Sequence, residues 1–169
     1  MMKKKRLGIL LSALAAGMIE AFSIMRLHGV FSCIQIGNIL LGAVALANGR
    51  WAAAGNHLLS VAGFLVGSVL CGLLSAKPHG RRWLLGKGIL TAAVLIFVVL
   101  LPENMDSVAV CLLALLCGSW FPDISPREDG CVPVIVFGVG VLLGAILVSC
   151  LGELVFAICA ALSLAPAVL

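Results

Sequence analysis

Charged residues are scarce in this sequence. They make up 11% of its 169 residues, whereas hydrophobic residues make up 63%. A soluble domain has about a quarter charged residues, and a chain this short cannot bury so much apolar side chain away from water. The composition therefore argues against a soluble globular protein, a disordered chain and a nucleic-acid-binding domain. The lipid bilayer is the partner that such a chain requires.

The sequence also lacks the short motifs of common enzymes and metal sites. It contains no Walker loop, dinucleotide fingerprint, zinc-protease helix or nucleophile motif, so we expect neither enzyme activity nor a cofactor. None of its seven cysteines forms a CxxC pair, and most of them lie in apolar runs. This pattern argues against a disulfide framework or a metal site, and the cysteines are expected to pack as small apolar side chains.

What the sequence has instead is a series of apolar segments. A backbone in lipid must satisfy its own hydrogen bonds, so these segments are predicted to be helices. The fold class is therefore all-α: a polytopic transmembrane helix bundle of six to seven apolar helices that forms a single integral membrane domain, residues 1–169. The segments are 7–25, 31–48, 57–76, 83–101, 107–121, 133–151 and 153–169. The last two are separated only by Gly152 and Glu153 and are expected to form a tight hairpin.

Basic residues predict the orientation of the chain. If all seven segments cross and the N-terminus is inside, the Lys and Arg residues divide almost evenly between the two sides. If segment 31–48 is a re-entrant helix instead, only Arg26 and Arg50 lie outside, as the positive-inside rule requires. This count favours the re-entrant form over a spanning one, with a cytoplasmic N-terminus in a bacterial inner membrane. The first segment continues to Met25, which suits a retained span better than a cleaved signal peptide.

The sequence also suggests a weak internal repeat, 7–101 and 107–169. Two pairs of stretches resemble each other: Phe64–Gly72 with Phe137–Ala145 and, more faintly, Leu14–Phe22 with Leu113–Phe121. With a re-entrant segment 31–48, each half has three crossings, so the second half is inverted, as in many secondary transporters. Chance recurrence in a glycine-rich chain is the alternative. Two GxxxG motifs predict close helix packing at four glycines: Gly63, Gly67, Gly140 and Gly144.

Four residues are candidates for a pathway taken by a small solute or ion. Glu20 lies well inside the first segment, where a carboxylate is costly and by default functional, as a proton-coupled or cation-binding group. Gln35 and Asn38 are three residues apart and share a helical face, and with Gly37 they would line the tip of a re-entrant helix. The alternative is structural: a hydrogen-bonded glutamate and interhelical amide hydrogen bonds.

The order of motifs along the first half resembles that of a known family. Segment 1 reads Ala16-Gly17-Met18-Ile19-Glu20-Ala21, segment 31–48 contains Ile36-Gly37-Asn38, and Phe64-x-x-Gly67 follows. This order resembles the YoaK-like family of bacterial integral membrane proteins, which carry a domain of unknown function. The similarity covers roughly residues 10–85 and returns at 133–169. It implies a membrane protein but carries over no settled activity.

The chain departs from the family pattern at three places. The family has Asp where this chain has Glu20, and Thr where it has Ile36. The family's second T-G segment is replaced here by the loop 122–132, so the chain resembles a member shortened in its second half. Two functions remain open: a small-solute or ion transporter, or a non-transporting membrane protein. For a transporter this small a homodimer is plausible, and the GxxxG faces offer one contact between its two copies. The non-transporting protein would be an assembly partner or a degenerate transporter.

Overall fold

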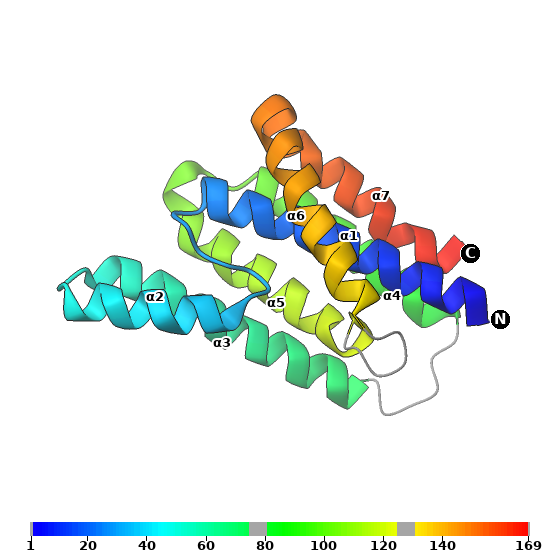
Figure 1. Cartoon of the computed structure of the whole chain (residues 1–169), viewed down its shortest axis with the longest axis horizontal. Helices are drawn as coiled ribbons and strands as arrows, with labels where there is room; N and C mark the ends of the chain where they lie inside the picture. Colours follow the sequence, from blue (N-terminus) through cyan, green and yellow to red (C-terminus); the bar gives the residue numbers. More distant parts are fainter. Residues whose placement is uncertain (1, 75–80, 125–130, 169) are drawn as a thin grey trace.

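A computed structural model describes residues 2–74, 81–124 and 131–168 of the chain, and these are almost entirely helical (Figure 1). The prediction of an all-α bundle is confirmed. The helices lie close to the predicted apolar segments, and two short 3-10 turns, η1 (Glu103–Met105) and η2 (Gly152–Leu154), join neighbouring helices. The α-helices are α1 (Met2–Arg26), α2 (Gln35–Ala47), α3 (Trp51–Leu74), α4 (Arg81–Val99), α5 (Asp106–Ile124), α6 (Val132–Leu151) and α7 (Val155–Val168).

Helix α1 is the central element of the bundle. Every residue from Ala15 to Ser23 is buried, because α5, α6 and α7 all pack against this stretch. Alanine and glycine dominate the first part of this stretch, which lets neighbouring backbones come close. Further along, the rings of Phe22 in α1 and Phe156 in α7 stack with centroids 4.3 Å apart. From Arg6 to Arg26 the helix rises about 30 Å, the thickness of a bilayer core.

The chain between α1 and α3 doubles back on itself. His28 and Gly29 adopt positive φ angles of 57° and 75°, and they reverse the chain after α1 ends. Residues 30–34 then run back beside α1, and α2 leaves this stretch in the same direction as α1 (Figure 1). Figure 1 shows that α1 ends and α3 begins at the same end of the bundle. This path agrees with the re-entrant form of segment 31–48, whose position in the membrane stays a prediction. The predicted helical range 31–48 is wrong at its start, because residues 31–34 are not helical.

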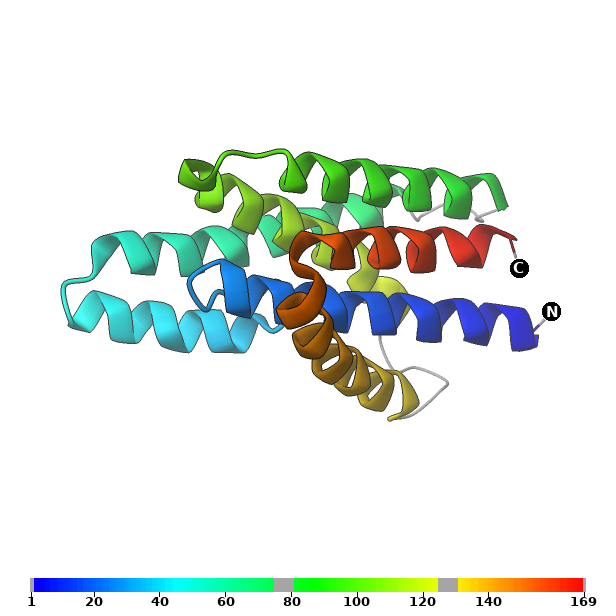
Figure 2. The ribbon, with the colours of Figure 1, turned by 90° about the horizontal axis from the view of Figure 1, so that it is seen from above.

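A sharp turn separates α6 from α7. Gly152 has a φ of 57° and ends α6, and η2 leads directly into α7. Figure 2 shows α6 crossing α1 obliquely, while α7 runs alongside α1 toward the C-terminus. The predicted tight turn at Gly152 and Glu153 is present, but α6 and α7 make few contacts with each other. Helix α6 packs mainly against α1, whereas α7 packs against α4 and α1.

Two pairs of helices, α1 with α6 and α5 with α3, repeat the same backbone contacts. In each pair a glycine of one helix faces a backbone carbonyl of the other, and the two pairs run in opposite directions (Figure 1). The contacts are Gly17 with Phe137, Gly140 with Leu14, Gly118 with Phe64, and Gly67 with Leu115. They match Phe64 with Phe137, as the sequence did, but they match Leu14 with Leu115 and not with Leu113. The faint match was therefore two residues out of register, and a repeat of whole halves stays a prediction.

The GxxxG glycines pack inside one chain. Gly63 and Gly67 lie against α5, while Gly140 and Gly144 lie against α1, and all four are buried. A Cβ atom on Gly144 would lie 2.7 Å from the Cα of Met18. These faces are thus already occupied, which corrects the suggestion that they join two copies of the chain.

Candidate functional site

The candidate site is the place where the returning stretch 30–34 meets α1. The Glu20 side chain is fully buried there, and its carboxylate accepts three backbone hydrogen bonds. The N–H groups of Ser32 and Cys33 both donate to Oε2 at 2.7 Å, and the N–H of Ile34 donates to Oε1 at 3.1 Å. These three residues lead into α2, whose first residue is Gln35, so the carboxylate lies near the positive dipole end of that helix.

Further contacts hold the same stretch along α1. The Ser32 hydroxyl donates to the Ser23 hydroxyl at 2.8 Å, and the Cys33 thiol lies 3.8 Å from the carbonyl oxygen of Ala16. Ser23, Glu20 and Ala16 occupy successive turns of one helical face. The returning stretch therefore follows α1 for about two turns, and Glu20 lies in the middle of this contact.

Asn38 holds the stretch from the other side. Its Oδ1 accepts the N–H of Phe31 at 3.0 Å, and its Nδ2 donates to the Phe31 carbonyl at 2.6 Å. The same Nδ2 lies 2.8 Å from Oε1 of Gln35 and 3.0 Å from Oγ of Ser60 in α3. His57 of α3 adds a contact from Nδ1 to Oδ1 at 3.1 Å. Asn38 thus ties α2, α3 and the returning stretch together, and it is fully buried.

Gln35 and Gly37 play smaller parts. Gln35 donates from Nε2 to the Ser32 carbonyl at 2.8 Å, and the predicted shared face of Gln35 and Asn38 is confirmed by their direct contact. A Cβ atom on Gly37 would lie 2.8 Å from Cε2 of Phe31, so this glycine makes room for the ring. Ile36, where the family pattern has a threonine, points outward and is 82% exposed.

This arrangement is a saturated polar cluster. Among the described residues, no buried side-chain nitrogen or oxygen is left without a hydrogen-bond partner, and no group of metal-ligating side chains is found. One face of the returning stretch is held by a carboxylate, whose protonation changes the number of bonds it accepts, and the other face by an amide, which does not titrate. In chemical terms, the carboxylate of Glu20 occupies a position at a helix N-terminus where an anion is favoured.

Sequence reasoning found Glu20, Gln35, Gly37 and Asn38 but missed their partners. His57 was not among the predicted residues, yet it is only 6% exposed and contacts Asn38. Ser23 and Ser60 gave no signal, because an isolated serine in an apolar helix is common. His57 and Ser60 are three residues apart in α3 and therefore lie on one face of that helix. This spacing was the sequence signal that could have identified both as partners of Asn38.

The outer surface of the bundle defines the class of protein. Large apolar side chains are exposed along α3, α4 and α6. Soluble monomeric proteins rarely expose an apolar surface of this extent to water. Three helical stretches are long and apolar enough to cross a membrane: Arg6–Arg26, Trp51–Leu73 and Val132–Ala165, the last of which contains the α6–α7 turn. Three shorter helices are also apolar. The chain is a helical membrane protein.

The comparison with protein families gives a more specific assignment. Residues 7–122 match the family model described as a protein of unknown function, DUF1275, so the chain belongs to this family. The match includes α1, the returning stretch, α2, α3 and α4, and it ends within α5. It does not include α6 and α7, where the sequence suggested that the family pattern returns. No curated protein and no solved structure matches the chain.

Proposed function

We propose that this chain transports a small solute or ion across a bacterial inner membrane. The part that moves during transport is the re-entrant segment 27–47, which comprises the chain after α1 and helix α2. One observation carries the proposal: three backbone N–H groups at the start of α2 converge on the buried carboxylate of Glu20. Secondary transporters with inverted repeats use interrupted helices in the same way, with helix N-termini directed at anionic groups inside the membrane. The oppositely directed helix pairs α1–α6 and α5–α3 support the same class.

Glu20 is the residue that we propose couples transport to protons. The ionised carboxylate accepts hydrogen bonds through both oxygens, whereas a protonated carboxyl turns one oxygen into a donor. Protonation therefore removes at least one of the three contacts to residues 32–34 and weakens the attachment of the returning stretch. The freed N–H groups then favour an incoming anion. A proton and an anion would thus enter together, and their release would restore the contacts to Glu20.

Gln35, Gly37 and Asn38 complete the proposed pathway. Asn38 holds both backbone groups of Phe31, so its side chain has to rearrange when the returning stretch moves. Gln35 is bonded to this same stretch and offers an amide to the solute after release. Gly37 allows the Phe31 ring to lie across α2, and the ring then closes the site when no solute is bound.

Flux through proteoliposomes tests this function. The full chain is reconstituted with an internal pH dye, and inward gradients of chloride, nitrate, sulfate and succinate are applied separately. We expect at least one gradient to acidify the lumen faster than in protein-free vesicles, and we expect Glu20→Gln to abolish the effect. Ser149→Ala removes an exposed hydroxyl of α6 that donates to the Ala145 carbonyl of its own helix, and it should leave the flux unchanged. The absence of flux with every anion, for folded protein, would overturn the proposal.

A non-transporting membrane protein is the second candidate. Two observations favour it. The buried polar atoms of the described residues all have partners within the chain, so the cluster around Glu20 is complete without a solute. In addition, the two halves differ in their connections. Helices α1 and α3 are joined through α2, whereas only seven residues separate the end of α5 at Ile124 from the start of α6 at Val132, too few for a second re-entrant helix. Failure of the flux experiment would favour this candidate.

A further inference from the structure

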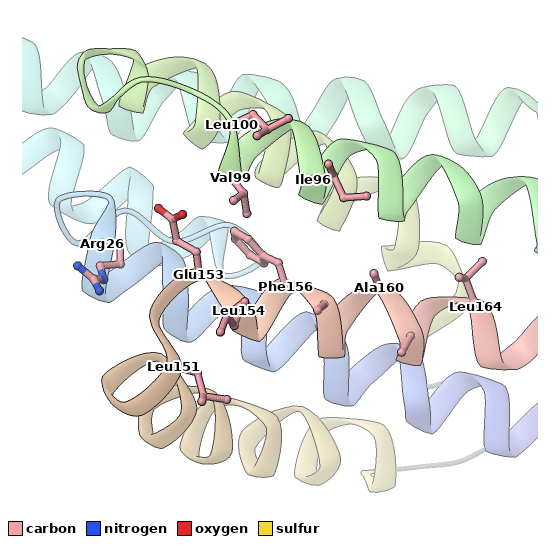
Figure 3. Close-up of a pocket in the computed structure, with 12 residues that line it drawn as sticks. Arg26, Ile96, Val99, Leu100, Leu151, Glu153, Leu154, Phe156, Ala160 and Leu164 are labelled. Atoms are coloured by element: carbon pink, nitrogen blue, oxygen red, sulfur yellow. The ribbon is translucent and has the colours of Figure 1, made fainter.

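A groove lies between α4 and α7, at the end of the bundle where α1 ends (Figure 3). Its volume is about 840 Å³, within the range of about 300–1,000 Å³ that is typical of ligand sites. Its long walls are apolar: Ile96 of α4 and Leu100, which follows that helix, face Leu164 and the small side chains of Ala157 and Ala160 on α7. This groove does not include Glu20 or Asn38, and so it is separate from the candidate site above.

Two opposite charges lie at one end of the groove. Arg26 is the last residue of α1, and Glu153 lies in the turn between α6 and α7. Nη2 of Arg26 lies 3.5 Å from the position that a Cβ atom on Gly152 would take, so the guanidinium rests against this turn. Both side chains are exposed, and within the described part of the chain neither makes an ion pair or a side-chain hydrogen bond. Figure 3 shows both charged groups at the same end of the apolar groove.

We propose that this groove binds an amine-bearing zwitterionic phospholipid, phosphatidylethanolamine being the simplest. The Arg26 guanidinium fits a phosphate, which it can bind through two parallel hydrogen bonds. The Glu153 carboxylate fits the primary ammonium group, and one acyl chain lies along the alanine face of α7. The order of charge and apolar surface along the groove matches the order of headgroup and tail in a lipid.

Charge complementarity selects this occupant over others. A phosphatidylglycerol headgroup offers Glu153 only neutral hydroxyl donors and brings a net negative charge beside it. A phosphatidylcholine headgroup has a quaternary ammonium without N–H groups, so it cannot donate to the carboxylate. A second copy of the chain would need to bring its own apolar ridge and two charges of opposite sign in the same order. This inference holds whether or not the protein is a transporter.

Native mass spectrometry of the delipidated full chain in detergent tests the proposal. Phosphatidylethanolamine, phosphatidylcholine and phosphatidylglycerol with identical acyl chains are added one at a time. We expect the ethanolamine lipid to bind roughly five- to tenfold more tightly than the other two, the size expected of one hydrogen bond at an exposed site. Equal binding of all three lipids would overturn the proposal without any variant.

Three variants locate the binding. Glu153→Gln should remove the preference for the ethanolamine lipid, and Arg26→Gln should weaken binding of all three lipids. Ala157→Phe fills the groove and should lower lipid binding regardless of the headgroup, whereas Arg50→Gln, an exposed arginine outside the groove, should change nothing. If Glu153→Gln keeps the preference, or if Ala157→Phe converts a dimer into monomers while lipid binding stays intact, the proposed site is wrong.

Discussion

Gly67 of α3 lies directly against the backbone carbonyl of Leu115 in α5, and no side chain fits between them. The same relationship joins Gly140 of α6 to Leu14 of α1. Backbones this close gain van der Waals contacts over several turns, which is the main source of helix association in lipid. The two glycine contacts therefore fix the register of the two helix pairs that frame the bundle.

Replacing one of these glycines should destabilise the protein. Gly67→Val forces a branched side chain into backbone atoms that cannot move aside, and overpacking of this kind costs about 1–3 kcal/mol. The measurement is the temperature at which the detergent-solubilised protein loses its monodisperse elution peak. Gly72→Val, in the same helix but with nothing within 4 Å of the added Cβ, is the matched control and should lower this temperature much less. Equal losses in both variants would contradict the close contact.

The Glu20 contacts predict that the amides of residues 32–34, which precede α2, lose protection from hydrogen exchange in two steps as the side chain of Glu20 is changed. Glu20→Gln leaves one N–H of residues 32–34 facing an amide donor, while Glu20→Ala leaves all three without their acceptor. Each unsatisfied buried group costs about 1–3 kcal/mol, so local opening should become easier in that order. Hydrogen exchange of the amides of Ser32, Cys33 and Ile34 measures this opening. Unchanged exchange in both variants would show that the carboxylate does not hold the stretch.

Asn38 should control access to the returning stretch. Asn38→Leu removes the hydrogen bonds that Asn38 makes to Phe31 and Ser60 and leaves the Phe31 N–H without its acceptor, while the bond from Ser60 Oγ to the Phe31 carbonyl remains. We expect Cys33, now half-buried, to react several times faster with a small maleimide in this variant. Asn48→Leu is the control, since Asn48 is exposed and bonds only to the Val44 carbonyl of its own helix turn. Equal labelling rates in the Asn38→Leu variant and the unmodified chain would show that Asn38 does not hold the returning stretch in place.

Much of the fold could be predicted from the sequence because lipid imposes a simple rule. Long apolar runs must become helices, and the helix ends agree with the predicted segments within a few residues at most places. The re-entrant path was favoured by the count of Lys and Arg, because making segment 31–48 re-entrant moves Arg50 outside and moves Arg127 and the four basic residues within 77–87 inside. The non-helical start of that segment was not foreseen, because its backbone N–H groups bond to a side chain that lies 12 to 14 residues earlier.

The candidate site was predicted less completely than the fold. An isolated carboxylate in an apolar helix is conspicuous, so Glu20 stood out. Its partners are backbone groups, which carry no sequence signal, and so the sequence could not distinguish a pathway residue from one that holds a loop. His57 was missed for a related reason: a position near a segment end suggests a boundary, while α3 in fact begins six residues earlier, at Trp51.

The re-entrant path of segment 27–47 is the central claim, and membrane topology tests it most directly. Reporter fusions that end at Ala53 and at Gly80 read out the side of the membrane reached on each side of α3. With the N-terminus in the cytoplasm, we predict that the Ala53 fusion is extracytoplasmic and the Gly80 fusion cytoplasmic. The reverse result, Ala53 inside and Gly80 outside, would make the segment an ordinary span and would contradict the claim.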